Sequence, residues 1–197
     1  MLKNFNITRF TFLKYKNNLF YNKSMDLEKL IYDSLREYYS FFGNKKKVLY
    51  KIRAELSIKE GELNKSLQLK IKKKLIAVIF YYNYEEIKTR SIYSFLSLKN
   101  KKILNKIKNY SKKIQTLKIS NSIYISRFSV NQNYSGKGFG SLLLKKLINI
   151  ANKKNKNSIV LHVNKNNHKA IKFYKKNKFK FYKKDNSFTH NLMILKL

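Results

Sequence analysis

The chain has 197 residues, a formal net charge of +35 and no cysteine. Disulfides and thiolate metal sites are therefore excluded, and we expect no metal, because His162, His168 and His190 show neither ligand-like spacing nor neighbouring carboxylates. No run of about 20 apolar residues is present, which excludes a membrane-spanning helix, and we expect a single cytoplasmic domain over residues 1–197.

The excess of positive charge has two interpretations. Only five of the 45 basic residues are arginine, and proline and tryptophan are absent. This bias is typical of A/T-rich codons, whereas a protein selected to bind nucleic acid would use more arginine, whose planar fork bonds phosphate and guanine bidentately. We therefore favour genome composition over selected nucleic-acid binding as the explanation of the positive charge. The electrostatic field of so basic a protein still attracts anions.

The amino-terminal half predicts two helices among strands. Residues before Met25 lack the apolar core of a signal sequence, so we interpret them as containing a first strand. Apolar residues at helical or strand spacing predict the remaining elements. In order, these are a strand at 5–12, helices at 26–43 and 48–60, strands at 67–71 and 75–82, and a helical insert at 103–114.

The carboxyl half alternates strands and helices more tightly. The predicted elements are a strand at 123–130, a helix ending near Lys153, a strand at 158–163, a helix that Asn167 caps, and strands at 179–183 and 191–197. Residues 158–163 are almost continuously apolar, as in a central strand that is covered on both faces. The order predicts an α/β (α+β) fold.

Three of the five glycines lie between a predicted strand and a predicted helix, at Gly136, Gly138 and Gly140. Glycine permits positive φ, so successive N–H groups can point at one anion at the positive end of the following helix. The spacing G-x-G-x-G matches neither a dinucleotide fingerprint nor a Walker loop. The loop favours a phosphate or pyrophosphate ligand, and the alternative is a strand-to-helix turn without one.

Residues 124–197 resemble the GNAT superfamily of acetyl-CoA-dependent N-acetyltransferases. Tyr124–Val130 is similar to the family's fourth strand, and Tyr134–Gly140 is similar to its pyrophosphate loop. Leu161–Val163 resembles the fifth strand, Asn167–Tyr174 the fourth helix, and Phe179 the turn after that helix. Residues 5–82 agree with the family only in the order of their predicted helices and strands. The resemblance implies a mixed, mostly antiparallel central sheet flanked by helices, with the helical insert between the third and fourth strands.

The resemblance also implies acetyl-CoA as co-substrate, bound where the fourth and fifth strands splay apart. Its pantetheine would pair with the backbone of Phe128, Ser129 and Val130. Its pyrophosphate would lie on N–H groups of the loop, at Gly136, Lys137, Gly138, Phe139, Gly140 and Ser141. Asn167 matches a family asparagine that contacts the cofactor arm, and a helix cap is its other interpretation.

Tyr174 matches the family's catalytic proton donor to the leaving thiolate. A tyrosine near Ile171 and Phe173 is also typical of a core position, so this interpretation stays open. No acid lies on the predicted strand 123–130, and Glu85 or Glu86 is the candidate base, acting directly or through water.

Two positions depart from the family pattern. Ser135 replaces a glutamine or arginine that reaches phosphate or braces the loop, and Lys178 replaces a glycine before Phe179. Neither change removes the predicted binding of the cofactor's pyrophosphate, because phosphate is held mainly by backbone N–H groups. We expect somewhat weaker cofactor binding than in close relatives.

The resemblance implies direct transfer of an acetyl group from acetyl-CoA to a primary amine of a small molecule, protein or peptide. Nine of the ten acids lie between Asp26 and Glu86, where they would either meet a cationic acceptor or decorate surface helices. One alternative is a basic nucleic-acid or ribosome-associated binding protein with a structural glycine loop. Another is a protein of the same fold that binds acyl-CoA without catalysis.

If the chain binds nucleic acid, we predict that it does so without sequence preference and with steep dependence on salt. Lysine contacts to phosphate act through counterion release, so affinity should fall by orders of magnitude between roughly 50 and 200 mM salt. Titrating labelled duplexes of different sequence across this range tests the prediction. A sequence-specific site that survives 200 mM salt would contradict it.

Overall fold

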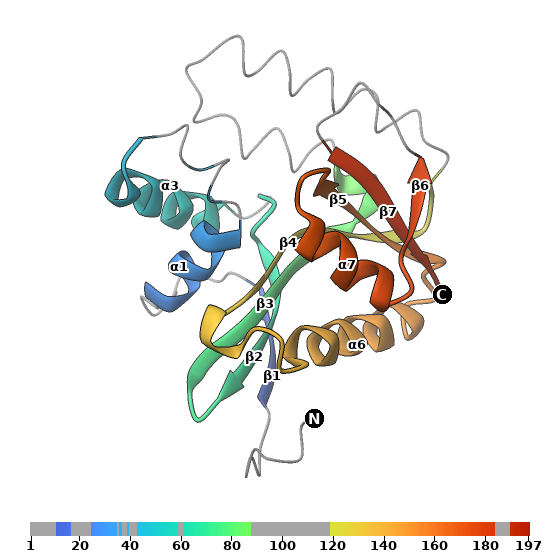
Figure 1. Ribbon diagram of the computed structural model, residues 1–197, viewed down its shortest axis with the longest axis horizontal. Coiled ribbons are helices and arrows are strands. Elements are labelled where there is room, and N and C mark those ends of the chain that lie inside the picture. Colours follow the sequence, from blue (N-terminus) through green and yellow to red (C-terminus); the bar gives the residue numbers. More distant parts are fainter. Residues whose placement is uncertain are drawn as a thin grey trace.

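Seven strands form one mixed sheet in the order β1-β2-β3-β4-β5-β7-β6, with helices on both faces (Figure 1). The computed structural model describes residues 11–16, 25–34, 36, 39, 43–58, 61–87, 119–183 and 190–197. The strands are β1 (Thr11–Lys16), β2 (Lys65–Ile71), β3 (Lys74–Asn83), β4 (Ser122–Val130), β5 (Ser158–Asn164), β6 (Lys180–Lys183) and β7 (His190–Lys196). The helices are α1 (Met25–Ser34), α3 (Lys45–Ser57), α6 (Phe139–Asn152) and α7 (His168–Lys176), with the 3₁₀ turns η1 (Tyr84–Glu86) and η2 (Gln132–Tyr134).

The sheet is antiparallel except between β4 and β5, which run parallel. This confirms the predicted mixed, mostly antiparallel sheet. The parallel pairing is short, because it joins only residues 122–125 of β4 to residues 158–161 of β5. Beyond that point the two strands diverge, and Figure 1 shows β1–β4 and β5–β7–β6 as two wings of the sheet.

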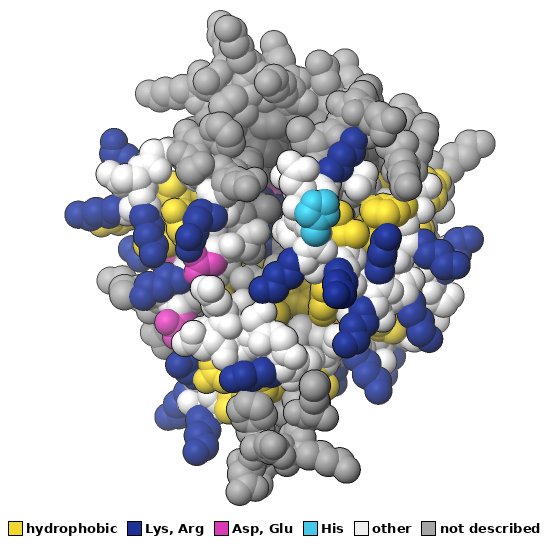
Figure 2. Space-filling model, viewed as in Figure 1, with side chains coloured by type: hydrophobic (Ala, Val, Ile, Leu, Met, Phe, Trp, Pro, Cys, Tyr) yellow, Lys and Arg dark blue, Asp and Glu magenta, His cyan; other side chains and the backbone are white. Residues whose placement is uncertain are grey.

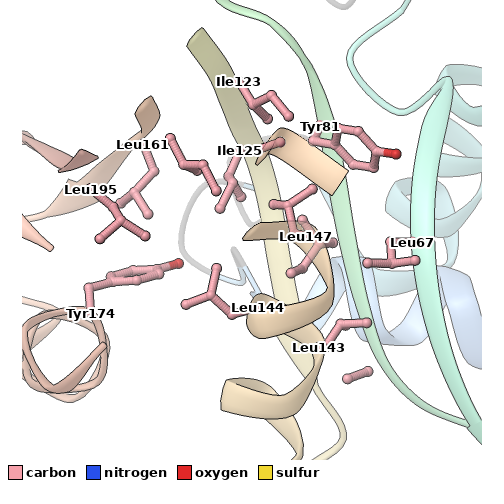
Figure 3. Packing of buried hydrophobic residues seen from close by; sticks show 14 of the residues in the cluster. Leu67, Tyr81, Ile123, Ile125, Leu143, Leu144, Leu147, Leu161, Tyr174 and Leu195 are labelled. Carbon is pink, nitrogen blue, oxygen red and sulfur yellow. The ribbon is translucent and has the colours of Figure 1, made fainter. Parts of the chain in front are cut away.

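Both faces of the central strand β3 are covered, and its eight inner residues are all buried. Alternate side chains of a strand point to opposite faces. Ala77, Ile79 and Tyr81 pack with α6, whose apolar stripe includes Leu143, Leu144 and Leu147 (Figure 3). Val78 and Phe80 pack on the other face in a cluster with α1 and α3. Among the described residues, no helix combines the length and apolar character that crossing a membrane requires.

Most predicted elements are present within one or two residues of their expected ends. The helix predicted at 48–60 instead spans Lys45–Ser57, because Asn44 caps its start. The first strand extends beyond its predicted end, since β1 pairs with β2 as far as Lys16. An edge strand is located by its pairing partner, which the apolar pattern of residues 5–12 does not specify. The predicted strand residues before Thr11, the end of the first helix at 40–42 and the predicted insert at 103–114 lie outside the described residues.

The helix α7 ends in a Schellman motif with lysine in place of glycine. Lys178 has a φ of +68°, and the N–H of Phe179 donates to the carbonyl of Tyr174 while that of Lys178 donates to Lys175. The rings of Tyr174 and Phe179 lie 5.5 Å apart, which is the apolar contact that accompanies this motif. The family's glycine at this position therefore has a conformational reason, and this chain keeps the conformation without the glycine.

We predict that Lys178→Gly stabilises the protein by about 1 kcal/mol, because a left-handed conformation costs a residue with a Cβ roughly 1–2 kcal/mol. For a domain of this size such a gain raises Tm by about 2–4 °C. Lys178→Ala is the control, since it removes the same charged side chain but keeps the Cβ. Equal stabilities of the two variants in chemical denaturation would contradict the prediction.

Candidate functional site

The opening between β4 and β5 begins at a β-bulge. Ile125 pairs with Tyr81 and Arg127 pairs with Phe80, so Ser126 is an extra residue in β4. The parallel pairing with β5 ends at Ile125. From Ser126 to Val130, no strand of the described chain pairs with this second edge of β4. The edge can therefore offer backbone groups to an extended ligand.

The glycine-rich loop follows β4 directly and leads into α6. Gly136 and Gly138 have φ values of +78° and +87°, and Gly138 is the N-cap of α6. A Cβ added at either position would meet no atom within 4 Å, so space is open beside the loop at the positive end of the helix. Gly140 differs, because its added Cβ would lie 3.2 Å from the ring of Phe173. The third glycine therefore permits close packing of α6 against α7.

Residues 128–130 and 136–141, which are predicted to hold the cofactor, follow one another along β4, the glycine loop and the start of α6. The side chains of Ser129 and Phe139 are buried, and the ring of Phe128 packs edge-on against Phe173 at 5.4 Å. These observations agree with the predicted use of main-chain groups at these positions. Lys137 is exposed, with its Nζ 5.6 Å from the ring centroid of Tyr134.

Asn167 is the N-cap of α7, as predicted. Its side-chain oxygen accepts a hydrogen bond from the N–H of Ala170 at 3.0 Å. The residue is exposed, which leaves its amide group accessible from solvent. The helix cap is thus present, and contact with a cofactor stays a prediction.

Tyr174 is buried on α7 beside the opening. Its ring lies among Phe128, Phe173 and Phe179, with centroid distances of 6.4, 5.3 and 5.5 Å. Figure 3 shows its phenol pointing from α7 toward the apolar cluster that contains Leu144 and Leu161. Burial raises the pKa of Tyr174, so its hydroxyl is protonated at neutral pH. Among the described residues, none forms a hydrogen bond with this hydroxyl.

Charge is distributed unevenly over the molecule. The sequence contains no Asp or Glu between Glu86 and Asp185, a stretch that includes α6, β5 and α7. On the face shown in Figure 2, lysines and arginines are spread over α6, α7, α1 and α3, whereas the acidic side chains in view lie on the side of α1 and α3. The positive field on the loop side attracts polyanionic ligands. Within the described part of the chain, no three His, Asp or Glu side chains gather as metal ligands.

A polar pair beside the opening was missed in the sequence. The hydroxyl of Tyr124 on β4 lies 3.0 Å from Nδ1 of His162 on β5. Burial lowers the pKa of His162 to about 3, with a further contribution from His190, so the imidazole is neutral at pH 7. The one available signal was a histidine inside an otherwise apolar strand.

The two candidate bases lie at the other end of β4. Glu85 accepts a hydrogen bond from the N–H of Asn121 at 2.6 Å, and Glu86 accepts one from the side chain of Asn83. Asn121 precedes the bulge residue Ser126 by five positions, about 16 Å along a strand. The structure therefore does not bring Glu85 or Glu86 to the opening.

Comparison with known proteins agrees with these features. The model of the acetyltransferase (GNAT) family matches residues 29–179. No curated protein matches the chain by sequence.

Several solved structures are similar. The PaiA N-acetyltransferase from Thermoplasma acidophilum in complex with coenzyme A is 19% identical with a TM-score of 0.58, and the alignment covers 95% of this chain and 99% of that chain. An N-acetyltransferase from Staphylococcus aureus Mu50 is 20% identical with a TM-score of 0.60, covering 87% and 93%. A GNAT family acetyltransferase from Elizabethkingia anophelis with acetyl-CoA bound is 13% identical with a TM-score of 0.55, covering 95% and 98%.

We predict that Gly138→Glu abolishes acetyl-CoA binding in a folded protein. The new side chain would enter the open space beside the loop, and its charge would repel a pyrophosphate. Calorimetric titration with acetyl-CoA measures the loss.

Gly138→Ala is the control for backbone strain at this position. The alanine variant has the same conformational cost of a positive φ but lacks the bulk and the charge of the glutamate side chain, so it should lose less affinity for acetyl-CoA. Unchanged affinity in folded Gly138→Glu would show that the loop is not the pyrophosphate site.

Proposed function

Because the chain belongs to the GNAT family of acetyltransferases, we propose that it transfers an acetyl group from acetyl-CoA directly to a primary amine. The observation that carries the proposal is the opening at the β4 bulge, followed without interruption by the glycine loop and the start of α6. An unpaired strand edge suits the amide groups of pantetheine, and the loop suits a pyrophosphate. The amine acceptor is supported by two similar solved structures that are named as N-acetyltransferases.

The proposed proton donor is Tyr174. Acetyl-CoA supplies the acetyl group, and after transfer its sulfur leaves as a thiolate that takes up a proton. A phenol can serve this role only if it carries its proton at neutral pH, and burial of Tyr174 favours the protonated form. Its position on α7 is fixed from two sides, by the ring of Phe128 on β4 and by the Schellman turn at Phe179.

For the proton that the amine must lose, we propose release to water, because Glu85 and Glu86 lie at the other end of β4. Attack on the thioester requires an amine with a free lone pair, so an ammonium acceptor must first be deprotonated. The Tyr124 and His162 pair lies where β4 leaves β5. Burial lowers the pKa of His162 to about 3, so its imidazole is too weak a base to take a proton from an ammonium group.

Acetyl-CoA calorimetry, followed by turnover assays with a panel of small-molecule and peptide amines, tests this function. We expect binding and release of free CoA thiol with at least one amine. Binding without turnover would favour an acyl-CoA-binding protein that lacks catalysis. Absence of acetyl-CoA binding would remove the proposal.

We predict that Tyr174→Phe lowers the single-turnover rate by about 10²- to 10⁴-fold, the usual contribution of general-acid catalysis. The phenylalanine ring preserves the packing with Phe128 and Phe179, so the fold and acetyl-CoA affinity should change little. A single-turnover experiment is needed because slow product release can hide the chemical step.

Tyr182→Phe is the matched control, since Tyr182 is an exposed tyrosine on the neighbouring strand β6 and should tolerate the change. Full single-turnover activity of Tyr174→Phe would mean that Tyr174 is a core residue only.

A further inference from the structure

Three acids on the α1 and α3 side of the sheet are buried, although acids usually remain at the surface. Glu28, Glu55 and Glu62 expose 5%, 5% and 9% of their surface, and each is paired with a cation. Glu28 binds Arg53 at 2.8 Å, Glu55 binds Lys51 at 3.1 Å, and Glu62 binds Arg127 at 3.2 Å. For these three acids the structure rules out the interpretation that they merely decorate the surface. Glu62 contacts the bulge of β4 through its backbone carbonyl and through Arg127.

Glu62 reaches the bulge from the turn that precedes β2. Its backbone carbonyl accepts a hydrogen bond from the hydroxyl of Ser126 at 3.0 Å. Its carboxylate contacts the guanidinium of Arg127, the next residue along β4. The same guanidinium donates to the carbonyl of Ser126 at 2.7 Å. Glu62 therefore contacts both the extra residue of the strand and the cation that satisfies the carbonyl of that residue.

These contacts have a physical reason in the bulge itself. An extra residue interrupts the regular ladder, and its carbonyl needs a partner outside the ladder. Arg127 provides that partner with a side chain that is only 14% exposed. A guanidinium with so little access to water is costly unless an anion faces it. The carboxylate of Glu62 is positioned to hold the guanidinium against the bulge.

We propose that Glu62 is a positioning residue, which through Arg127 holds the bulge of β4 in the shape that keeps β4 apart from β5. The inference rests on the proposed function, because the opening is the acetyl-CoA site. Losing the Glu62 carboxylate removes this ion pair from Arg127 and loosens Ser126, so the edge at residues 126–130 no longer has one fixed geometry. Small displacements at such a site reduce rates or affinities by up to about 100-fold.

The test compares Glu62→Gln with Glu28→Gln in the full chain. Both variants replace a buried, arginine-paired carboxylate by an amide of the same shape, but Glu28 pairs with Arg53 on α3. We measure the Kd for acetyl-CoA, the KM values of both substrates, the free energy of unfolding, and amide hydrogen exchange of residues 126–130 without ligand.

We expect Glu62→Gln to weaken acetyl-CoA binding by about 10- to 100-fold and to speed exchange at residues 126–130, with a smaller change in the acceptor KM. Glu28→Gln should do neither. Adding Glu62→Gln to Arg127→Gln should cause little further loss, because the two residues act as one unit.

Equal losses of affinity in Glu62→Gln and Glu28→Gln, in proportion to lost stability, would overturn the inference. So would wild-type affinity in Glu62→Gln. If the wild-type protein itself fails to bind acetyl-CoA, the proposed function fails, and hydrogen exchange then decides this inference. Unchanged exchange at residues 126–130 in Glu62→Gln would reject it.

Discussion

The separation of β4 from β5 is the constraint on which the rest of this structure depends. Two parallel strands that paired along their whole length would satisfy each other's backbone groups and leave nothing for a ligand. Here the pairing stops after four residues, and the extra residue Ser126 bends β4 at the same point. The strand then leads directly into the glycine loop and α6, so the unpaired edge and the start of the helix lie on one continuous path.

The bulge also changes which side chains of β4 face α6. Before it, Ile123 and Ile125 belong to the apolar cluster under this helix, and after it Phe128 and Val130 do. The extra residue thus keeps the core continuous while it turns Arg127 toward the opposite face, where Glu62 lies. The same shift places Phe128 against α7, and this contact holds the helix that carries Tyr174.

The sequence predicted the features that depend on local chemistry. The cap at Asn167 and the positive φ of Gly136 and Gly138 follow from a few neighbouring residues, and the structure contains both features. The resemblance to a known family supplied the mixed, mostly antiparallel sheet, which local patterns do not determine. The left-handed Lys178 was visible only as a departure from the family, because lysine by itself gives no signal for such a conformation.

Long-range contacts were not predictable from the sequence. Ser126 and Glu62 are 64 residues apart in the chain, and Tyr124 and His162 are 38 apart. Strand register brings the second pair together, and Glu62 reaches Ser126 from the turn that precedes β2. A bulge shifts that register by one residue and leaves no mark in an apolar strand. For the same reason Glu85 and Glu86 looked suitable as bases, although the pairing of β3 with β4 places them beyond the wrong end of the strand.

Determining the structure of the complex with acetyl-CoA tests the central claim most directly. The account predicts that the pantetheine runs along residues 126–130 of β4 and that the pyrophosphate lies on the backbone of residues 136–141, with the thioester within reach of the Tyr174 hydroxyl. A cofactor bound elsewhere on the sheet, or a pantetheine that leaves the edge of β4 unpaired, would contradict it.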